Sequence, residues 1–429
     1  MGWQMNRLLA YAFTTIVRHG ALTIIDADGV SHRYGDGNGD PVVVRLRDKA
    51  TERDLVIDPE MRLAEAYMDG RLVIEKGTAY DFLALLMENL TAHRLPPWSR
   101  IADFARRRIR FVSQLNTQRR ARRNAAHHYD VDPRIYRLFL DKDLQYSCAY
   151  FDPAETLHGD GLDDAQLAKK RHIAAKLNIA PQHRVLDIGC GWGGLALYLH
   201  QMCGAYVRGI TLSKSQYEAA RDRARNSGAD RDVTFAIEDY RETTGTFDRV
   251  VSVGMLEHVG PAAYDRFFSM VSDRLSQDGI ALIHTIARSD DASGITNPFI
   301  ANYIFPGGYI PALSELMASI ERSGLVLGDI EALRLHYALT LRRWRQRFAA
   351  NRVKAVAIAG ERFCRMWEFY LAGSEASFRY QNLVVLQIQL VRKLESAPIT
   401  RAYIAATERK LKARETPPHG PQIRIVAGR

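Results

Sequence analysis

The chain has few cysteines and none of the spacings that a disulfide framework or a zinc site requires. Its four cysteines are isolated from one another in a chain of 429 residues: Cys148, Cys190, Cys203 and Cys364. This usage is typical of proteins kept in a reducing cytoplasm, and it contains no metal-ligand pattern. We therefore expect a cytoplasmic protein without a metal site.

Long hydrophobic runs are also missing. No apolar stretch approaches the roughly 20 residues that cross a bilayer as a helix. Residues 1–20 are mildly apolar but lack a basic start, a clean apolar block and a small-residue cleavage site, so we expect no signal peptide. The hydrophobic share of 47% is ordinary for a globular protein, and the length favours two domains.

Acidic residues are outnumbered, with 49 Asp and Glu against 59 Lys and Arg, which gives a net charge of +10. Between Arg94 and Arg123 ten arginines stand against one acid, with isoleucine and phenylalanine interleaved. A second arginine cluster surrounds Trp344 and Phe348. Such segments suit a peripheral position on an anionic membrane surface, although RNA binding and a simple solvated surface remain alternatives.

Residues 20–90 read as a small α+β unit. Strands are expected at Leu22–Ile25 and Val42–Leu46, and helices at Asp58–Met68 and Ala79–Leu90. After Asn124, strand-like and helix-like segments alternate, which predicts a mostly parallel sheet with helices on both faces. Seven strands are expected, near Val185–Ile188, Tyr206–Thr211, Val233–Ile237, Phe247–Val253, Ile280–Thr285, Val326–Leu333 and Leu383–Leu390.

The fold class is therefore α/β, Rossmann-like, with a smaller N-terminal α+β domain. We expect an N-terminal domain at 1–93, a basic helical linker at 94–125, the main domain at 126–394 and a flexible basic tail at 395–429. The stretch Ala287–Pro311 interrupts the alternation and is rich in Pro, Gly and aromatic residues. An insertion of this length is typical of a functional lid.

The first strand of the main domain runs directly into a glycine-rich turn. Gly189, Gly191 and Gly193 follow Asp187, and a helical pattern begins at once. Glycine lets the backbone approach a ligand at the carboxyl end of a strand. The spacing G-x-G-x-G with an acid in the turn is typical of S-adenosylmethionine enzymes, so these four residues are candidate cofactor-binding residues.

The next two strands end on further candidate contacts. No acid follows the second strand, so the neutral pair Thr211 and Gln216 would have to serve the ribose, next to Leu212. After the third strand, Asp239 is placed to accept from the adenine amino group and Tyr240 to lie against the ring. A plain turn acid is the alternative for Asp239.

Five motifs then occur in order: Gln145–Phe151, the glycine turn, Val253–Gly260, Leu282–Ile286 and Tyr303–Gly308. Together they resemble the cyclopropane-fatty-acyl-phospholipid synthase family, which includes the mycolic acid cyclopropane synthases, from about Asp130 to Lys393. Ala66–Gly70 resembles part of the lipid-docking domain of its phospholipid-acting members. The resemblance implies an S-adenosylmethionine-dependent methyltransferase that adds a methylene group to the cis double bond of an unsaturated phospholipid, and a homodimer.

The resemblance also implies residue roles. Tyr146 and Ser147 would close over the methionine part of the cofactor. A pocket for a bicarbonate ion, acting as general base, would be formed by Cys148, Glu257, His284, Ile286 and Tyr337. The chemistry is consistent with this set, because ring closure needs a base and a side-chain carboxylate beside a carbocation risks alkylation.

Aromatic residues of the insertion are candidates for the acyl chain, because aromatic faces stabilise a carbocation and exclude water. They are Phe299, Tyr303 and Phe305. The family often has a cysteine after a Tyr-Leu pair in its C-terminal helix, but here Tyr370 and Leu371 lead to Ser374. A mechanism that depends on a thiol there is therefore in doubt.

Each of these residues has a structural alternative. Glu257 can be a helix-start acid, His284 a core histidine, Cys148 a small buried residue, and the aromatic residues simple packing. Competing functions are a sibling enzyme that leaves a methyl or methylene branch, a small-molecule methyltransferase, and a non-catalytic lipid- or RNA-binding protein. The docking unit and the intact glycine turn favour the lipid enzyme, and nucleic acid is not the expected partner.

Overall fold

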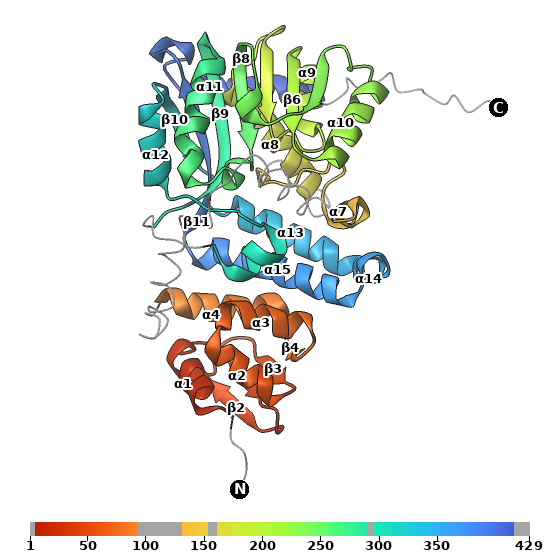
Figure 1. Ribbon diagram of the computed structural model, residues 1–429, viewed down its shortest axis with the longest axis vertical. Coiled ribbons are helices and arrows are strands. Elements are labelled where there is room, and N and C mark those ends of the chain that lie inside the picture. Colours follow the sequence, from red (N-terminus) through yellow and green to blue (C-terminus); the bar gives the residue numbers. More distant parts are fainter. Residues whose placement is uncertain (1–4, 93–130, 153–160, 291–295, 416–429) are drawn as a thin grey trace, which may run out of the picture.

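The computed structural model describes residues 5–92, 131–152, 161–290 and 296–415. Three tiers follow one another along the molecule (Figure 1): the N-terminal unit, a layer of helices, and a large sheet covered by helices. The Rossmann-like α/β fold with a mostly parallel seven-stranded sheet is confirmed. The expected domain boundaries stay predictions, and the arginine-rich linker at 94–125 lies outside the described residues.

The N-terminal unit has a four-stranded sheet in the order β2-β1-β3-β4. Both predicted strands, β1 and β3, have the expected bounds, but β2 and β4 were not expected. Strand β2 reads Ser-His-Arg-Tyr and has no buried residue, so it carries no apolar alternation to detect. The elements are α1 (Arg7–Ile16), β1 (Leu22–Ile25), β2 (Ser31–Tyr34), β3 (Val42–Leu46), α2 (Lys49–Ile57), α3 (Pro59–Met68), β4 (Leu72–Lys76) and α4 (Ala79–Ala92).

The large sheet has the order β10-β11-β9-β8-β5-β6-β7. Its strands are parallel except β11, which is antiparallel to both neighbours. All seven strands lie where the sequence predicted them. They are β5 (Arg184–Ile188), β6 (Tyr206–Thr211), β7 (Val233–Ile237), β8 (Phe247–Val253), β9 (Leu275–Arg288), β10 (Val326–Ala332) and β11 (Leu383–Val391).

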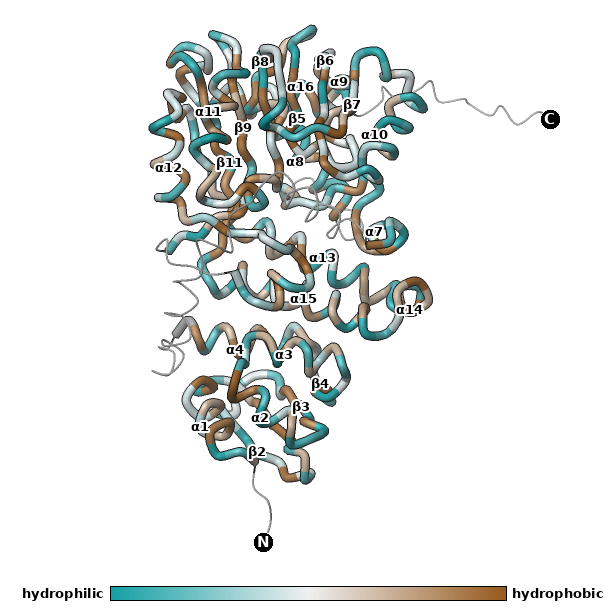
Figure 2. Tube along the Cα trace, in the orientation of Figure 1, coloured by the Kyte–Doolittle hydropathy of each residue, from teal (hydrophilic) through white to brown (hydrophobic). Residues whose placement is uncertain are grey.

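Helices cover the two faces of this sheet, and their outward sides are hydrophilic while the strands are hydrophobic, as α10 and β9 show in Figure 2. Central strands of a parallel sheet are buried on both faces, which explains their nearly continuous apolar sequences. The covering helices are α8 (Leu162–Lys176), α9 (Gly194–Cys203), α10 (Lys214–Asn226), α11 (Tyr264–Arg274), α12 (Leu313–Arg322) and α16 (Ala402–Glu415).

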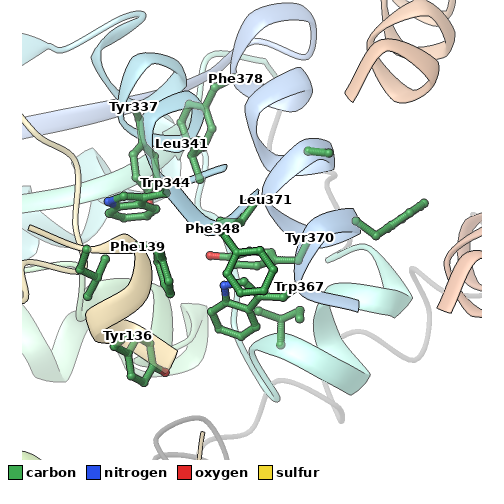
Figure 3. Packing of buried hydrophobic residues seen from close by; sticks show 14 of the residues in the cluster. Tyr136, Phe139, Tyr337, Leu341, Trp344, Phe348, Trp367, Tyr370, Leu371 and Phe378 are labelled. Carbon is green, nitrogen blue, oxygen red and sulfur yellow. The ribbon is translucent and has the colours of Figure 1, made fainter. Parts of the chain in front are cut away.

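The middle layer consists of α13 (His336–Ala350), α14 (Arg352–Ala359) and α15 (Glu361–Tyr380). Helix α15 packs against α13 on one side and against α3 and α4 of the N-terminal unit on the other (Figure 1). Together with α7 (Pro133–Phe139) this layer encloses an aromatic core (Figure 3).

The second arginine cluster does not form a membrane-facing surface. Trp344 and Phe348 are buried in the aromatic core, so these aromatic residues cannot enter a lipid interface. Three of the arginines make ion pairs within the protein: Arg345 with Glu375, Arg347 with Asp163, and Arg352 with Glu361 and Glu368. The interfacial interpretation of this segment was therefore wrong.

The expected flexible tail at 395–429 is also corrected in part. Residues Ala402–Glu415 form α16, which packs against α8 and buries Ile404 and Leu411. Its end is held by Glu415, which pairs with Arg171 at 2.8 Å. With so few apolar residues, this helix gives little periodic signal, and its docking depends on charged partners distant in sequence. Residues 416–429 lie outside the described part.

The predicted lid at Ala287–Pro311 contains a short helix, η4 (Ile300–Ile304), and residues 291–295 lie outside the described part. Among the residues that the structure describes, no helix combines the length and the apolar character needed to cross a membrane.

Candidate active site

The glycine turn lies between β5 and α9. Gly189, Gly191 and Gly193 have φ of 82°, 53° and 79°, the left-handed region that glycine adopts without strain. A Cβ atom at Gly191 would meet nothing within 4 Å, whereas one at Gly193 would lie 2.8 Å from the Phe235 ring. Gly191 therefore borders open space, and Gly193 permits close packing behind the turn.

A cavity opens beside this turn, at the carboxyl ends of β5, β6 and β8, where ligands bind in folds of this kind. Every predicted cofactor-binding residue lines it except Gly193. The residues concerned are Tyr146, Ser147, Asp187, Gly189, Gly191, Thr211, Leu212, Gln216, Asp239 and Tyr240. Trp192, Met255 and His258 line it as well, and the sequence analysis had assigned them no role.

The cavity wall contains a buried acid without a partner. Asp187 is 1% exposed, and its Oδ2 makes no hydrogen bond within the described part of the chain. Burial raises the pKa of Asp187 to about 7, against the opposing effect of the Lys169 ammonium group. An unpaired acid at a cavity wall suits a ligand that brings a donor.

Two polar pairs occupy the remaining ends of the strands. The Thr211 hydroxyl donates to Gln216 Oε1 at 3.0 Å. This neutral pair lies at the end of β6, where the sequence contains no acid. Asp239 forms a two-pronged ion pair with Arg241, at 2.7 Å and 2.5 Å. Sequence reasoning missed Arg241, because an arginine after a turn acid gives no sign that the two pair. The expected adenine acceptor is therefore already engaged, although a carboxylate accepts more than two hydrogen bonds.

The wall opposite the glycine turn is the Tyr146–Ser147 segment. The Tyr146 and Tyr370 hydroxyl groups are 2.8 Å apart, which ties this segment to α15. From α8, Gln166 and Lys169 also hold it. Sequence reasoning missed Gln166 and Lys169, because a basic run such as Lys169-Lys170-Arg171-His172 is typical of an exposed helix face, whereas these residues are buried.

Glu257 is the best defined of the predicted bicarbonate-pocket residues. It lies in a short helix, η2 (Leu256–His258), and its Oε1 accepts from the Ile286 amide at 2.6 Å. Its Oε2 is buried and without a hydrogen-bond partner among the described residues. Burial raises the pKa of the Glu257 carboxyl group to about 6, although the Ile286 amide opposes the shift. The backbone amide of Ile286, another residue of the predicted pocket, thus donates to Glu257 in this structure.

His284 and Ile286 lie on the same face of β9, two residues apart. Gln387 of β11 is paired with His284, and its side-chain nitrogen lies 3.2 Å from His284 Nδ1. Gln387 is thus the side chain that holds the His284 ring in place. Burial holds the pKa of His284 well below its usual value, so the ring is neutral.

Cys148 and Tyr337 complete the predicted set. Burial raises the pKa of the Cys148 thiol, which agrees with our not treating it as a nucleophile. The amide of Ala149 donates to Thr340 Oγ1 of α13, which brings Cys148 close to Tyr337, one turn earlier on that helix. Burial also raises the pKa of Tyr337, with Tyr370, Cys148 and Glu257 near enough to add to the shift.

Of the three predicted acyl-chain residues, one lines the cavity and two do not. Phe305 lines the cavity and lies 5.8 Å from the His258 ring. Phe299 and Tyr303 do not line it: Phe299 packs edge-on against Phe369, and the Tyr303 hydroxyl donates to Glu65 of the N-terminal unit at 2.9 Å. Phe299 and Tyr303 thus connect this segment to α15 and to the N-terminal unit.

The aromatic core lies next to this site. Figure 3 shows Tyr337 against Trp344 on α13, and Tyr370 near Trp367 on α15. Ser374, where the family often has cysteine, does not line the cavity, and Cys364 is fully buried in this core. No cysteine side chain of α15 therefore borders the cavity.

Burial raises the pKa of Glu257 from 4.5 to about 6, so its ionisation lowers the free energy of unfolding increasingly between these two pH values and by a constant amount above them. At lower pH, where Glu257 is protonated in both the folded and the unfolded protein, this cost is absent. We expect Glu257→Gln to raise the free energy of unfolding by up to about 2 kcal/mol near pH 7.5 and to change it little near pH 4. Denaturant unfolding at the two pH values measures this. A gain that is equal at both pH values would contradict a buried, charged Glu257.

Comparisons with known proteins agree with this geometry. The sequence profile of the family described as mycolic acid cyclopropane synthetase matches residues 116–388. The cyclopropane-fatty-acyl-phospholipid synthase of Escherichia coli (strain K12) is 35% identical over 358 residues, 83% of this chain and 89% of that protein. A probable fatty acid methyltransferase of Pseudomonas putida is 40% identical over 274 residues, 62% of this chain and 68% of that protein.

Among solved structures, a mycolic acid cyclopropane synthase in complex with SAH and CTAB is similar, with a TM-score of 0.59 and 32% identity. The match covers 98% of that chain but 63% of this one. A substantial part of this chain therefore has no counterpart there.

Proposed function

This chain belongs to the mycolic acid cyclopropane synthetase family, and from that premise we propose that it converts the cis double bond of a phospholipid acyl chain into a cyclopropane ring. It is an S-adenosylmethionine-dependent methyltransferase by fold and by family. The observation that carries the proposal is the adjacency of two features: a glycine-walled cavity and a buried cluster around Glu257.

The cavity residues fit S-adenosylmethionine in chemistry. The open space at Gly191 takes ligand atoms against the backbone, and the unpaired Asp187 carboxylate suits a cationic amino group. Thr211 and Gln216 offer neutral partners for ribose hydroxyl groups, and Asp239 and Tyr240 lie where the adenine is expected.

The aromatic surroundings suit the chemistry of an alkene. A double bond is a weak nucleophile, so the sulfonium methyl must be held rigidly against it in a dry site. Methyl transfer leaves a carbocation in the chain, which the faces of Tyr146 and Phe305 can stabilise. Loss of a proton from the added methyl group then closes the ring.

We further propose that Cys148, Glu257, His284, Ile286 and Tyr337 hold a bicarbonate ion. When bound, bicarbonate supplies a base for the final proton. The fit is supported by the unpaired Glu257 oxygen, which can accept from the hydroxyl of bicarbonate, and by the neutral ring of His284. The Ile286 amide already donates to Glu257, so we propose that it contributes to the pocket by orienting that carboxylate and not by contacting bicarbonate.

The direct test is incubation with methyl-labelled S-adenosylmethionine and vesicles of cis-unsaturated phospholipid. We expect label in the acyl chain and ring protons in its NMR spectrum. A methyl or methylene branch in place of a ring would favour the second candidate, a fatty-acid C-methyltransferase, which the Pseudomonas relative brings into consideration. Label in the head group or in no lipid at all would refute both.

We also propose that the enzyme works as a homodimer at the surface of an anionic membrane, facing the cytoplasm. The arginine-rich segment from Arg94 to Arg123, which lies outside the described residues, supports the membrane position on sequence alone, and the homodimer rests on the family resemblance. At such a surface each arginine contributes about 1 kcal/mol at low ionic strength, and salt weakens the effect.

Activity on anionic vesicles should therefore fall steeply between low and high salt, while activity on detergent-dispersed lipid should change little. Replacing Arg106, Arg107, Arg108 and Arg110 with Gln removes four of the ten arginines, so it should weaken vesicle binding and reduce the salt dependence, as vesicle sedimentation and label transfer would show. Equal binding of anionic vesicles by this variant and the unaltered protein at low salt would exclude the membrane role of the segment.

A further inference from the structure

We propose that Lys169 is a positioning residue that fixes the Ser147 hydroxyl as a hydrogen-bond donor toward the carboxylate of the methionine moiety. The inference rests on the proposed function, because it concerns the same cavity. It assigns a role to α8, a helix that the motifs of the cofactor site do not include.

One face of α8 holds the segment that walls the cavity. Lys169 Nζ lies 2.6 Å from Gln145 Oε1 and 2.8 Å from Ser147 Oγ. Gln166, one turn earlier, donates to the backbone carbonyls of Gln145 at 3.3 Å and Ser147 at 3.0 Å. Both α8 side chains are essentially fully buried, at 1% and 0% exposed. The segment is thus fixed through side chain and backbone from the same helix.

The direction of these hydrogen bonds follows from the groups involved. An ammonium group has three donors and no acceptor, so Ser147 Oγ must accept from Lys169. The hydroxyl proton of Ser147 is then left to donate elsewhere, and Ser147 lines the cavity. A neutral partner in place of Lys169 could reverse this polarity, because a hydroxyl both donates and accepts.

The charge of Lys169 also favours an anionic group of the ligand near Ser147. Within the described part of the chain it forms no ion pair, and its two contacts are neutral oxygens, whereas the neighbouring Lys170 pairs with Asp143 at 2.6 Å. Burial lowers the pKa of Lys169 to about 8. Asp141, Asp143 and Asp187 are near enough to act on this charge, but none of their carboxylates contacts the ammonium group in the described part of the chain. An ammonium group without a contacting carboxylate, one hydroxyl away from a ligand cavity, favours an anion there. The methionine carboxylate is the one anionic group of S-adenosylmethionine.

Two ligands separate this role from general support of the fold. S-adenosylhomocysteine carries the amino-acid carboxylate, and methylthioadenosine lacks the whole amino-acid part. In Lys169→Met we expect calorimetry to show an S-adenosylhomocysteine dissociation constant raised about ten- to hundredfold, the loss typical of a charge-assisted contact. The dissociation constant of methylthioadenosine should change less than about threefold, within the scatter of a contact worth under 1 kcal/mol.

Lys176→Met is the matched control. Lys176 lies on the same helix, is 0% exposed and pairs with Glu331, but it does not line the cavity or touch the Tyr146–Ser147 segment. Its loss should lower stability without separating the two ligands. Ser147→Ala should reproduce the effect of Lys169→Met on S-adenosylhomocysteine, and the double variant should add little to either change. Ser147→Ala also tests the proposal if Lys169→Met does not fold.

Equal weakening of both ligands in Lys169→Met, or no weakening in Ser147→Ala, would overturn the inference and leave Lys169 a support of the fold. Additive effects in the double variant would also overturn it, because they would mean that the two residues act separately. A failure of the proposed function has a different signature: a cavity that is not a cofactor site would leave the unaltered protein unable to bind either ligand, and a different lipid product would appear in the label-transfer assay without changing the binding of either ligand.

Discussion

Glu257→Gln should lower turnover by at least about 100-fold, the contribution of a positioned proton-transfer group, while cofactor affinity stays nearly unchanged. The reason is location: Glu257 bonds to Ile286 behind the cavity and does not line it, whereas the cofactor contacts are on the glycine turn and the neighbouring strand ends. Label transfer to vesicles measures turnover, and calorimetry with S-adenosylhomocysteine measures affinity. His284→Ala should behave in the same way.

The control is Glu315→Gln. Glu315 also accepts a backbone amide, that of Ala312 at 2.9 Å, and it accepts from the Tyr309 hydroxyl, but it lies outside the cavity. Its variant should keep near-normal turnover. If Glu257→Gln kept normal turnover, or lost cofactor affinity in step with activity, the bicarbonate-pocket assignment would be wrong.

Gly191→Val should abolish detectable cofactor binding in a protein that is still folded. The added Cβ meets no protein atom within 4 Å, so the side chain enters the space that the ligand needs. The φ of 53° costs a branched residue about 1–2 kcal/mol in stability, which a domain of this size can tolerate. Calorimetry with S-adenosylhomocysteine and thermal unfolding separate the two effects.

Gly228→Val is the matched control for that experiment. Gly228 has φ of 69° and also has nothing within 4 Å of an added Cβ, but it follows α10 on the surface, away from the cavity. The two variants should lose similar stability, and Gly191→Val alone should lose binding. Retained binding in folded Gly191→Val would remove the glycine turn from the site.

Much of the fold could be predicted because central strands of a parallel sheet are continuously apolar and the intervening helices are not. The central strand β8 has the predicted bounds for that reason. Where stability comes from contacts between distant charges, the sequence has no such periodic signal. Helix α16, held through Glu415 and Arg171, was therefore expected to be a loose tail.

The residues of the site differ in the same way in how well they could be predicted. Residues whose role depends on backbone shape, such as Gly189 and Gly191, could be identified from a local motif. Residues whose role depends on what lies across the cavity could not, and Lys169 and Gln166 were missed because a helical run of basic residues does not reveal its own burial. The hydrogen bond of Tyr303 to Glu65 was missed for a similar reason: an aromatic residue in a loop does not indicate which way it faces. Its role toward the acyl chain stays a prediction.

The bond between Tyr303 and Glu65 joins the wall of the cavity to a part of the chain 238 residues away in sequence. Arg362 of α15 also pairs with Asp69 of the N-terminal unit. A substitution in the N-terminal unit can therefore shift the position of α15 and of the segment beside the cavity without touching a ligand. An N-terminal unit exchanged from a relative would have to match this face of α15.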